Sequence, residues 1–283
     1  MIKIENLTFN YPKQDELFSS LNLQLTDGSI HGLLGKNGAG KTTLLKIIAG
    51  LRFPQKGYCR AYGFDTYKRY PDFLNKLYFV PEEFYTPPIS LKEFISIYGP
   101  FYPEFSQSDL FEYMREFEIP ESGNLSSFSY GQKKKFLVSF GLATNCKILI
   151  LDEPTNGLDI PSKSKFRKVL ASSINNNRSF IISTHQVRDI DQLIDPIVIL
   201  DEGEIIFNHN LDEISENIAI QIVDELPEEG VLYSESTISG YSIVKENIDN
   251  ESTALDVETI FNAVINNREK VEEIFSSQNQ QKS

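Results

Sequence analysis

The sequence contains no tryptophan and only two cysteines, and it has neither a long apolar run nor an excess of basic residues. The two cysteines, Cys59 and Cys146, lie far apart without the spacing of metal ligands. We therefore expect two reduced, inert thiols of a cytosolic protein rather than a disulfide.

No segment approaches the roughly 18 consecutive apolar residues of a membrane-spanning helix. The N-terminus alternates apolar and polar residues (Ile2, Ile4, Leu7 and Phe9) and does not form the apolar block of a signal sequence. We expect that the chain does not enter a membrane by itself.

Acidic residues outnumber basic ones, 40 to 27, which gives a net charge of −13. Binding to duplex nucleic acid depends on Lys and Arg that neutralise phosphates, so no nucleic-acid partner is expected. Hydrophobic residues make up 40% of the 283 residues, enough for a sizeable core. This length fits one large domain or a core with an appendage.

Residues 35–42 fit the pattern G-x-x-x-x-G-K-[ST] of a loop that cradles phosphates. The apolar run 30–34 before it predicts a buried strand, and residues 43–49 after it predict an apolar helix. Glycine-rich turns can direct backbone N–H groups at a phosphate, and the start of the helix adds its positive end. The residues expected to bind phosphate are Gly35, Lys36, Asn37, Gly38, Ala39, Gly40, Lys41, Thr42 and Thr43.

Two carboxylates follow the apolar strand predicted at 148–151, at the end where an open α/β sheet places its ligand. Because adjacent residues of an extended strand face opposite ways, we expect Asp152 and Glu153 to divide their roles. Asp152 is expected to hold Mg²⁺ together with the Thr42 hydroxyl. Glu153 is expected to orient or deprotonate the attacking water.

Three further features have both an ordinary and a functional interpretation. His185 follows another buried strand, 180–184, and is a candidate for sensing the γ-phosphate, although a lone histidine is usually structural. Tyr11 lies in a turn, where its ring can stack on a base or be an ordinary turn residue. The run Lys133–Lys135 is typical of a solvated helix face.

Two regions have sequence patterns that differ from that of the sheet domain. From about 88 to 140, helical segments at 91–98 and 110–117 predict an inserted helical subdomain. Residues 211–283 combine strand-like pieces at 218–223, 231–234 and 241–245 with a helical pattern at 257–265. We expect a domain over 1–210 and a small α/β appendage over 211–283. The appendage can be a stabilising cap, a dimer contact or a regulatory element.

The order of these motifs over residues 1–210 resembles the ATP-binding subunit of an ATP-binding-cassette (ABC) transporter. Gly35–Thr42 resembles the Walker A loop, 148–153 the Walker B strand with its catalytic glutamate, and 183–185 the switch histidine. Asp159 lies in the segment that resembles the D-loop, and Tyr11 falls at the adenine-stacking aromatic. Ser129, Gly131 and Gln132 match the signature motif.

Two positions depart from the family pattern. Glu82 stands where glutamine is usual in the Q-loop; a carboxylate can still ligate Mg²⁺ but adds negative charge beside Asp152 and Glu153. Tyr130 replaces the first glycine of the signature motif, where a positive φ would strain a tyrosine.

The resemblance implies an α/β P-loop NTPase fold with a mixed central sheet, an antiparallel β subdomain, the helical insert and the appendage. It implies an ATPase that uses ATP and Mg²⁺ and works as a head-to-tail homodimer, with Ser129 and Gly131 contacting the nucleotide of the second subunit. A separately encoded integral membrane permease would hold it at the inner, cytoplasmic face of the membrane. Similarity to bacterial ABC-2-type subunits favours export.

Two other function classes stay open at this point. One is a soluble ABC ATPase that handles DNA or ribosomes, although its usual second cassette, coiled-coil insert or zinc-binding cysteines are missing. The other is a regulatory module that binds ATP with little turnover. The sequence names no transported substrate.

Overall fold

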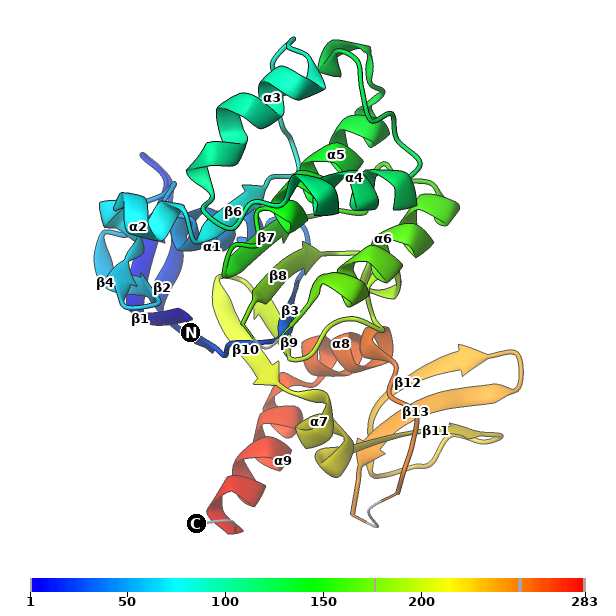
Figure 1. The fold of residues 1–283 in the computed structure, drawn as a ribbon. Helices are drawn as coiled ribbons and strands as arrows, with labels where there is room; N and C mark the ends of the chain where they lie inside the picture. The colour runs from blue at the N-terminus through cyan, green and yellow to red at the C-terminus, as the bar shows by residue number, and fades with distance from the viewer. Residues whose placement is uncertain (1, 176, 249–250, 282–283) are drawn as a thin grey trace.

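A computed structural model describes residues 2–175, 177–248 and 251–281, and within them six strands form a mixed sheet in the order β10-β9-β3-β8-β7-β6 (Figure 1). Their bounds are β3 (Ile30–Leu34), β6 (Leu77–Val80), β7 (Ile148–Asp152), β8 (Ser179–Thr184), β9 (Ile197–Asp201) and β10 (Glu204–His209). Strands β9, β3, β8, β7 and β6 pair in parallel, and β10 is antiparallel to β9. The carboxyl ends of the parallel strands therefore meet at one edge of the sheet, where α/β folds bind ligands.

The strands at the centre of this sheet are buried on both faces, which explains their continuous apolar sequences. One face packs on helix α1 (Lys41–Ile48) and on an antiparallel sheet of order β2-β1-β4-β5. The strands of that second sheet are β1 (Ile2–Asn10), β2 (Glu16–Leu25), β4 (Lys56–Ala61) and β5 (Phe64–Asp65). The alternating apolar residues of the N-terminus, Ile2, Ile4 and Leu7, thus lie in the core that also contains α1.

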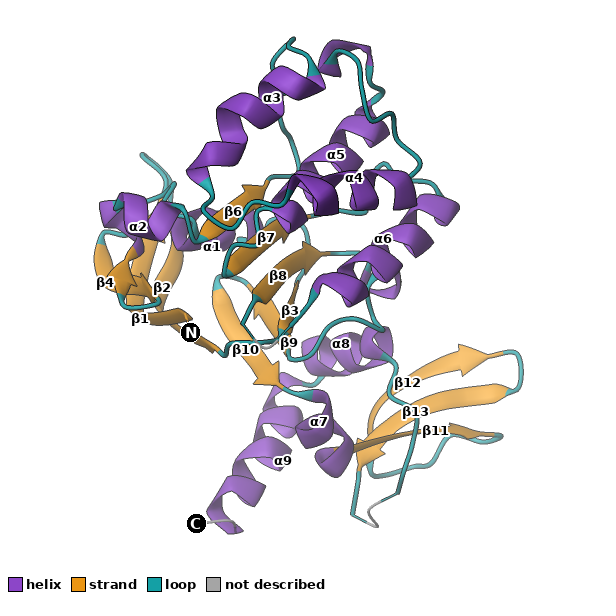
Figure 2. Ribbon diagram, in the orientation of Figure 1, coloured by secondary structure: helices purple, strands orange, loops and turns teal. Residues whose placement is uncertain are grey.

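Helices cover the other face of the central sheet (Figure 2). The helices between β5 and β10 are α2 (Pro71–Leu74), α3 (Leu91–Tyr98), α4 (Gln107–Glu116), α5 (Tyr130–Ala143) and α6 (Ile160–Ser173), with 3-10 turns η1 (Thr66–Lys68), η2 (Gly99–Phe101), η3 (Leu125–Ser127) and η4 (Val187–Asp189). The predicted helical segments at 91–98 and 110–117 correspond to α3 and α4. A capping box between Ser90 and Glu93 begins α3, so its start is fixed by local hydrogen bonds.

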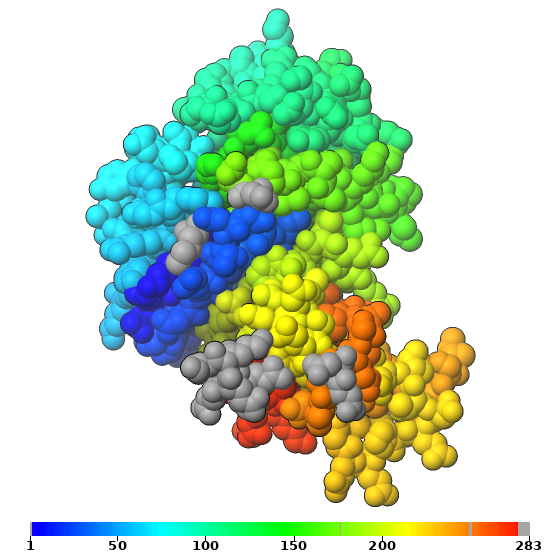
Figure 3. Space-filling view, turned by 60° about the horizontal axis from the view of Figure 1, so that its bottom comes forward, coloured from blue at the N-terminus to red at the C-terminus, as the bar shows by residue number. Residues whose placement is uncertain are grey.

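Residues after β10 form a smaller α/β region, which lies at the bottom of the molecule in Figure 1 and appears in yellow to red in Figure 3. Its elements are α7 (Leu211–Asn217), β11 (Ile218–Val223), β12 (Val231–Thr237), β13 (Gly240–Glu246), α8 (Val257–Asn266) and α9 (Arg268–Gln281), with the antiparallel order β11-β13-β12. One hydrophobic cluster runs from Ile182 and Val187 into Ile260 and Val264 of α8. The division of the chain at residue 210 therefore stays a prediction.

None of the helices in the described parts of the chain is both long and apolar enough to cross a bilayer.

Aromatic packing joins the helical insert to the sheet at Phe140 of α5. Its ring centroid lies 5.2 Å from that of Phe94 in α3, 5.6 Å from that of Tyr78 in β6 and 5.1 Å from that of Phe105. We expect Phe140→Ala to lower the free energy of unfolding by about 3–5 kcal/mol, because it opens a cavity in a fully buried site. Urea denaturation followed by circular dichroism measures this loss.

The control is Phe101→Ala, which removes a ring that is 65% exposed in the same insert. It should change the free energy of unfolding by less than about 1 kcal/mol. Equal losses in the two variants would contradict the assignment of Phe140 to the packing centre.

Candidate active site

The loop Gly35–Thr42 connects the end of β3 to the start of α1. Gly38 and Gly40 have φ values of 86° and 109°, which only glycine adopts without strain. Gly40 is the N-cap residue of α1, and no side chain caps that end. The first N–H groups of a helix have no partner within it, so this end of α1 is suited to an anion.

Lys41 is buried, and its ammonium group donates to two carbonyls of its own loop, at 2.7 Å to Gly35 and 3.2 Å to Lys36. It also lies 3.8 Å from Glu153 Oε1. Burial lowers the pKa of Lys41, and the carboxylates of Glu153 and Asp152 act in the opposite direction. The loop thus holds a positively charged ammonium group, and phosphate oxygens can replace the two carbonyls as its hydrogen-bond acceptors.

Asp152 is the last residue of β7 and accepts two short hydrogen bonds. Its Oδ2 accepts from Thr42 Oγ1 at 2.8 Å, and its Oδ1 accepts from Ser183 Oγ at 2.6 Å. These bonds join the ends of β7 and β8 to the start of α1, three segments that are far apart in the sequence. Thr42 and Asp152, which we expected to hold Mg²⁺ together, are thus hydrogen-bonded to each other.

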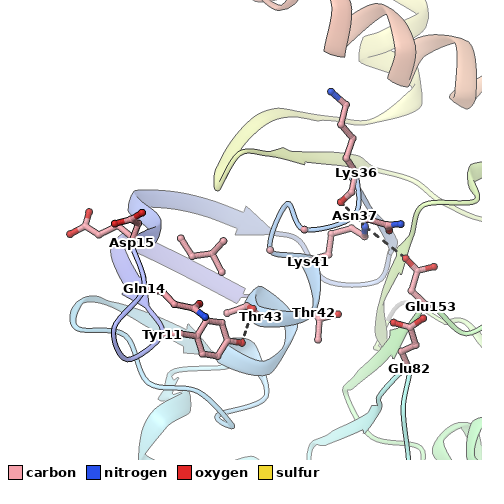
Figure 4. Close-up of a pocket in the computed structure, with 14 residues that line it drawn as sticks. Tyr11, Gln14, Asp15, Lys36, Asn37, Lys41, Thr42, Thr43, Glu82 and Glu153 are labelled. Atoms are coloured by element: carbon pink, nitrogen blue, oxygen red, sulfur yellow. Dashed lines mark hydrogen bonds and ion pairs between the residues drawn. The ribbon is translucent and has the colours of Figure 1, made fainter.

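Glu153 differs from the sequence-based expectation. We expected it to extend the strand and face opposite to Asp152, but its φ is 45°, in the left-handed region. Its N–H donates to Ser183, at 3.2 Å to the carbonyl and 3.1 Å to Oγ. The chain therefore turns at Glu153, and this turn brings the carboxylate toward Lys41 rather than to the opposite face of the sheet (Figure 4).

His185 follows β8 and lies against the same carboxylate. Its Nδ1 is 2.9 Å from Glu153 Oε1, and its backbone N–H donates to Glu153 Oε2 at 3.4 Å. The two residues that the sequence marked as catalytic candidates are thus in direct contact.

Tyr11 follows β1 and lies at the other end of the loop, where its hydroxyl is 3.0 Å from Thr43 Oγ1. Its ring meets Phe9 edge-on at 5.1 Å, and the guanidinium of Arg52 lies 5.8 Å from the ring centroid. Tyr11 therefore belongs to the same site as the phosphate loop, in a position fixed by packing.

Tyr11, the phosphate loop and Glu153 line one open cavity of about 550 Å³ (Figure 4), and Asp152 and His185 lie behind this lining. This volume lies within the usual range for small-molecule sites. The lining residues are Tyr11, Gln14, Asp15, Glu16, Leu17, Lys36, Asn37, Gly38, Gly40, Lys41, Thr42, Thr43, Glu82 and Glu153. Sequence reasoning missed residues 14–17 as part of the site. They form a turn followed by an alternating strand, and this pattern is the same in any other hairpin.

Glu82 follows β6 and also faces this cavity. Its Oε1 accepts a hydrogen bond of 2.9 Å from Asn156 Nδ2. Glu82 therefore joins Asp152 and Glu153 as a third carboxylate that acts on the charge of Lys41. The described residues contain no group of three or more His, Cys, Asp or Glu side chains that could hold a metal ion on its own.

Ser129, Gly131 and Gln132 lie outside the cavity, at the start of α5. Ser129 Oγ accepts from the Gln132 N–H at 3.2 Å, and Gln132 Oε1 accepts from the Ser129 N–H at 2.9 Å, so the two residues form a capping box. Asp159 similarly caps α6, accepting from the Ser162 N–H at 2.9 Å. Hydrogen bonds from the side chain and the backbone of Ser162 lower the pKa of Asp159. The structure does not bring these residues to the phosphate loop of their own chain.

Tyr130 is not strained. It is the first helical residue of α5, and its φ is not positive. Its ring stacks on Phe84 at 5.0 Å, and its hydroxyl donates to the carbonyl of Glu82 at 3.0 Å. The tyrosine thus connects α5 to the segment that carries Glu82.

The interpretation of Lys133–Lys135 as a solvated helix face is wrong. Lys134 is fully buried, and its Nζ donates to the carbonyls of Glu153 at 2.6 Å and Asn156 at 3.1 Å. Lys135 is partly covered and donates to the Phe117 carbonyl at 3.2 Å. A run of three lysines contains no signal that its middle member turns inward.

Comparison with known proteins finds relatives that are ATP-binding proteins of transporters. A model described as ABC transporter matches residues 18–156. The lantibiotic transport ATP-binding protein SrtF of Streptococcus pyogenes is 30% identical over 231 residues, which cover 77% of this chain and 94% of the relative. The bacitracin transport ATP-binding protein BcrA of Enterococcus faecalis is 30% identical over 219 residues, covering 76% and 70%.

Solved structures show the same fold. An ATP-binding subunit of an ABC transporter superposes with a TM-score of 0.68 at 24% identity, covering 76% of this chain and 91% of that one. A dimeric ATP-binding cassette in a post-hydrolysis state bound to ADP and Pi superposes with a TM-score of 0.65 at 23% identity, covering 75% and 99%.

Lys41→Met tests whether the loop binds a nucleoside triphosphate. Loss of a charged hydrogen-bond donor should raise the dissociation constant for ATP by about 10- to 100-fold, equivalent to about 1.5–3 kcal/mol. Equilibrium binding of a fluorescent ATP analogue measures the change. The control Lys56→Met, at an exposed position of β4, should bind as the wild type does. Unchanged binding by Lys41→Met would remove the loop from the nucleotide site.

Proposed function

The chain belongs to the ABC transporter family as a subunit that binds and hydrolyses ATP, and we propose that this hydrolysis drives export by a separate membrane subunit. The observation that carries the proposal is the convergence of Thr42, Asp152, Glu153 and His185 beside the phosphate loop.

The cavity of the phosphate loop receives the nucleotide. Lys41 exchanges its loop carbonyls for outer phosphate oxygens, and the uncapped start of α1 faces the phosphates. Tyr11 stacks on the base, since it lines the cavity and its hydroxyl is tied to Thr43.

Residues present at the site fit a magnesium ion. Thr42 and Asp152 offer hard oxygen ligands that already lie together, and Glu82 lines the same cavity. Magnesium is commonly held by one or two carboxylates together with substrate phosphates, and this agrees with the incomplete set of protein ligands here. When bound, the ion neutralises charge on the phosphates.

Glu153 orients the attacking water and accepts its proton, while His185 fixes the carboxylate and senses the γ-phosphate. The hydrogen bonds to Ser183 hold the backbone of Glu153 in place for this role. Both catalytic groups come from the ends of adjacent strands, so the sheet positions them.

A second copy of the chain completes each ATP site. Ser129 is exposed and lies outside the cavity of its own chain, so it is available to cap a nucleotide on a partner. Gly131 and Gln132, in the first turn of α5, and Asp159, at the start of α6, contribute to the same interface. The two copies then close when they bind ATP and separate again after its hydrolysis.

The membrane subunit docks in an apolar groove of about 960 Å³ between the β6 region and the helical insert. Tyr85 and Phe101, which are 80% and 65% exposed, line it together with Tyr98. Large exposed apolar patches are typical of interaction sites. Docking there places this subunit on the cytoplasmic face of the membrane. Relatives named for bacitracin and lantibiotic transport support transport as the task.

Glu153→Gln tests the catalytic assignment. Removing the base should lower the steady-state ATPase rate by about 10²- to 10⁴-fold and leave ATP binding intact. The control Glu202→Gln, at an exposed carboxylate in the turn after β9, should keep the wild-type rate. A wild type that binds ATP without turnover would instead favour a regulatory module. Undiminished turnover in Glu153→Gln would refute the assignment of the base.

Dimer closure is tested in the Glu153→Gln background, where bound ATP persists. Size-exclusion chromatography with light scattering should show a dimer only when ATP is present. Adding Ser129→Arg should weaken this dimer by about tenfold or more, because a long charged side chain enters the centre of the interface. Ser236→Arg, at an exposed position on β12, should not affect it. An ATP-dependent dimer that tolerates Ser129→Arg contradicts the arrangement.

A further inference from the structure

Lys134 is the middle residue of a lysine run, and the assigned roles at the active site do not include it. It lies on α5, and its side chain is fully buried. Its ammonium group donates to the carbonyls of Glu153 and Asn156, at 2.6 and 3.1 Å. Burying a charged group is costly unless it is paired and hydrogen-bonded, so this position needs a specific reason.

The turn held by Lys134 contains the strained backbone of Glu153. A left-handed conformation is unfavourable for a residue other than glycine, and it persists only when its surroundings enforce it. On one side, the Glu153 N–H is bound by Ser183. On the other side, the Glu153 carbonyl is bound by Lys134 and by the Asn156 N–H at 3.3 Å.

The same turn is tied to two departures from the family pattern. Asn156 donates from its side chain to Glu82 Oε1, and Tyr130 donates from its hydroxyl to the Glu82 carbonyl. The Lys134 ammonium lies 6.0 Å from the centroid of the Tyr130 ring. Burial lowers the pKa of Lys134, and the negative charges of Glu82, Glu153 and Asp152 oppose this lowering.

We propose that Lys134 is a positioning residue for ATP hydrolysis, which clamps the turn from Glu153 to Asn156 so that the Glu153 carboxylate faces the phosphate loop. The inference rests on the proposed function, because it acts through Glu153 as the base. Lys134 touches neither substrate nor reacting atoms; it acts on the backbone that aims the carboxylate.

A purely structural lysine would give different results. Loss of a structural contact lowers stability and affects ATP binding and turnover together. Loss of a positioning contact leaves ATP binding intact and lowers kcat, since a shift of about 1 Å in a catalytic group can cost about 100-fold in rate. The two roles are therefore separated by comparing the dissociation constant for ATP with kcat.

The experiment uses the full chain with Lys134→Met, which keeps the length of the side chain and removes its donors. We expect kcat to fall by about 10- to 100-fold and the dissociation constant for ATP to stay within about twofold of the wild type. Lys133→Met is the matched control: it changes the neighbouring lysine of the same helix, which is only partly buried, and should leave both values unchanged.

A double-mutant cycle shows whether Lys134 acts through Glu153. In the Glu153→Gln background, Lys134→Met should cause no further loss of the single-turnover rate, because residues that act as a unit are not additive. If Lys134→Met does not fold, Lys134→Gln, with a shorter polar side chain, replaces it in every measurement with the same expected direction.

Three outcomes overturn the inference: kcat in the substituted protein within about twofold of the wild type, ATP affinity that falls in parallel with kcat, or the same fold-loss in the Glu153→Gln background. Failure of the proposed function is a separate result. In that case the wild type does not hydrolyse ATP, or Glu153→Gln hydrolyses it at the wild-type rate.

Discussion

The hydrogen bonds that Asp152 accepts from Thr42 and Ser183 are the constraint on which the rest of the site depends. They fasten the ends of β7 and β8 to the start of α1, so the phosphate loop and the carboxylates keep one relative position. Ser183 then binds the N–H of Glu153, and Glu153 binds His185. Because Asp152 is almost fully buried, these bonds form in a low-dielectric environment where they are strong and directional.

Two buried lysines balance the negative charge that gathers at this edge of the sheet. Lys41 belongs to the phosphate loop and can exchange its carbonyl partners for a ligand, whereas Lys134 is held by backbone carbonyls beyond the cavity. Three carboxylates, those of Glu82, Asp152 and Glu153, lie within their influence. The extra negative charge of Glu82 is thus accompanied by a buried positive charge and by an amide donor from Asn156.

Helix α5 links surfaces that have different roles. Its first turn presents Ser129 at the exterior, Tyr130 reaches the Glu82 segment, Lys134 reaches the Glu153 turn, and Phe140 packs against the sheet and α3. Because a helix is rigid over this length, Ser129 and the turn at Glu153 have a fixed spacing within each subunit. The C-terminal region adds to this body through α8, which shares a hydrophobic cluster with the end of β8 and η4.

The sequence by itself determined the elements whose signals are local: the glycine-rich loop between a strand and a helix, the apolar strands that lead to Asp152 and His185, and the periodic helices α3 and α4. Only the tertiary structure decided the turn at Glu153, the burial of Lys134, the unstrained helical backbone of Tyr130 and the contribution of residues 14–17 to the cavity. The reason is physical. Periodicity and turn chemistry act between neighbouring residues, whereas these features arise from contacts such as Ser183 with Glu153 and Lys134 with Asn156, which exist only once distant segments have packed.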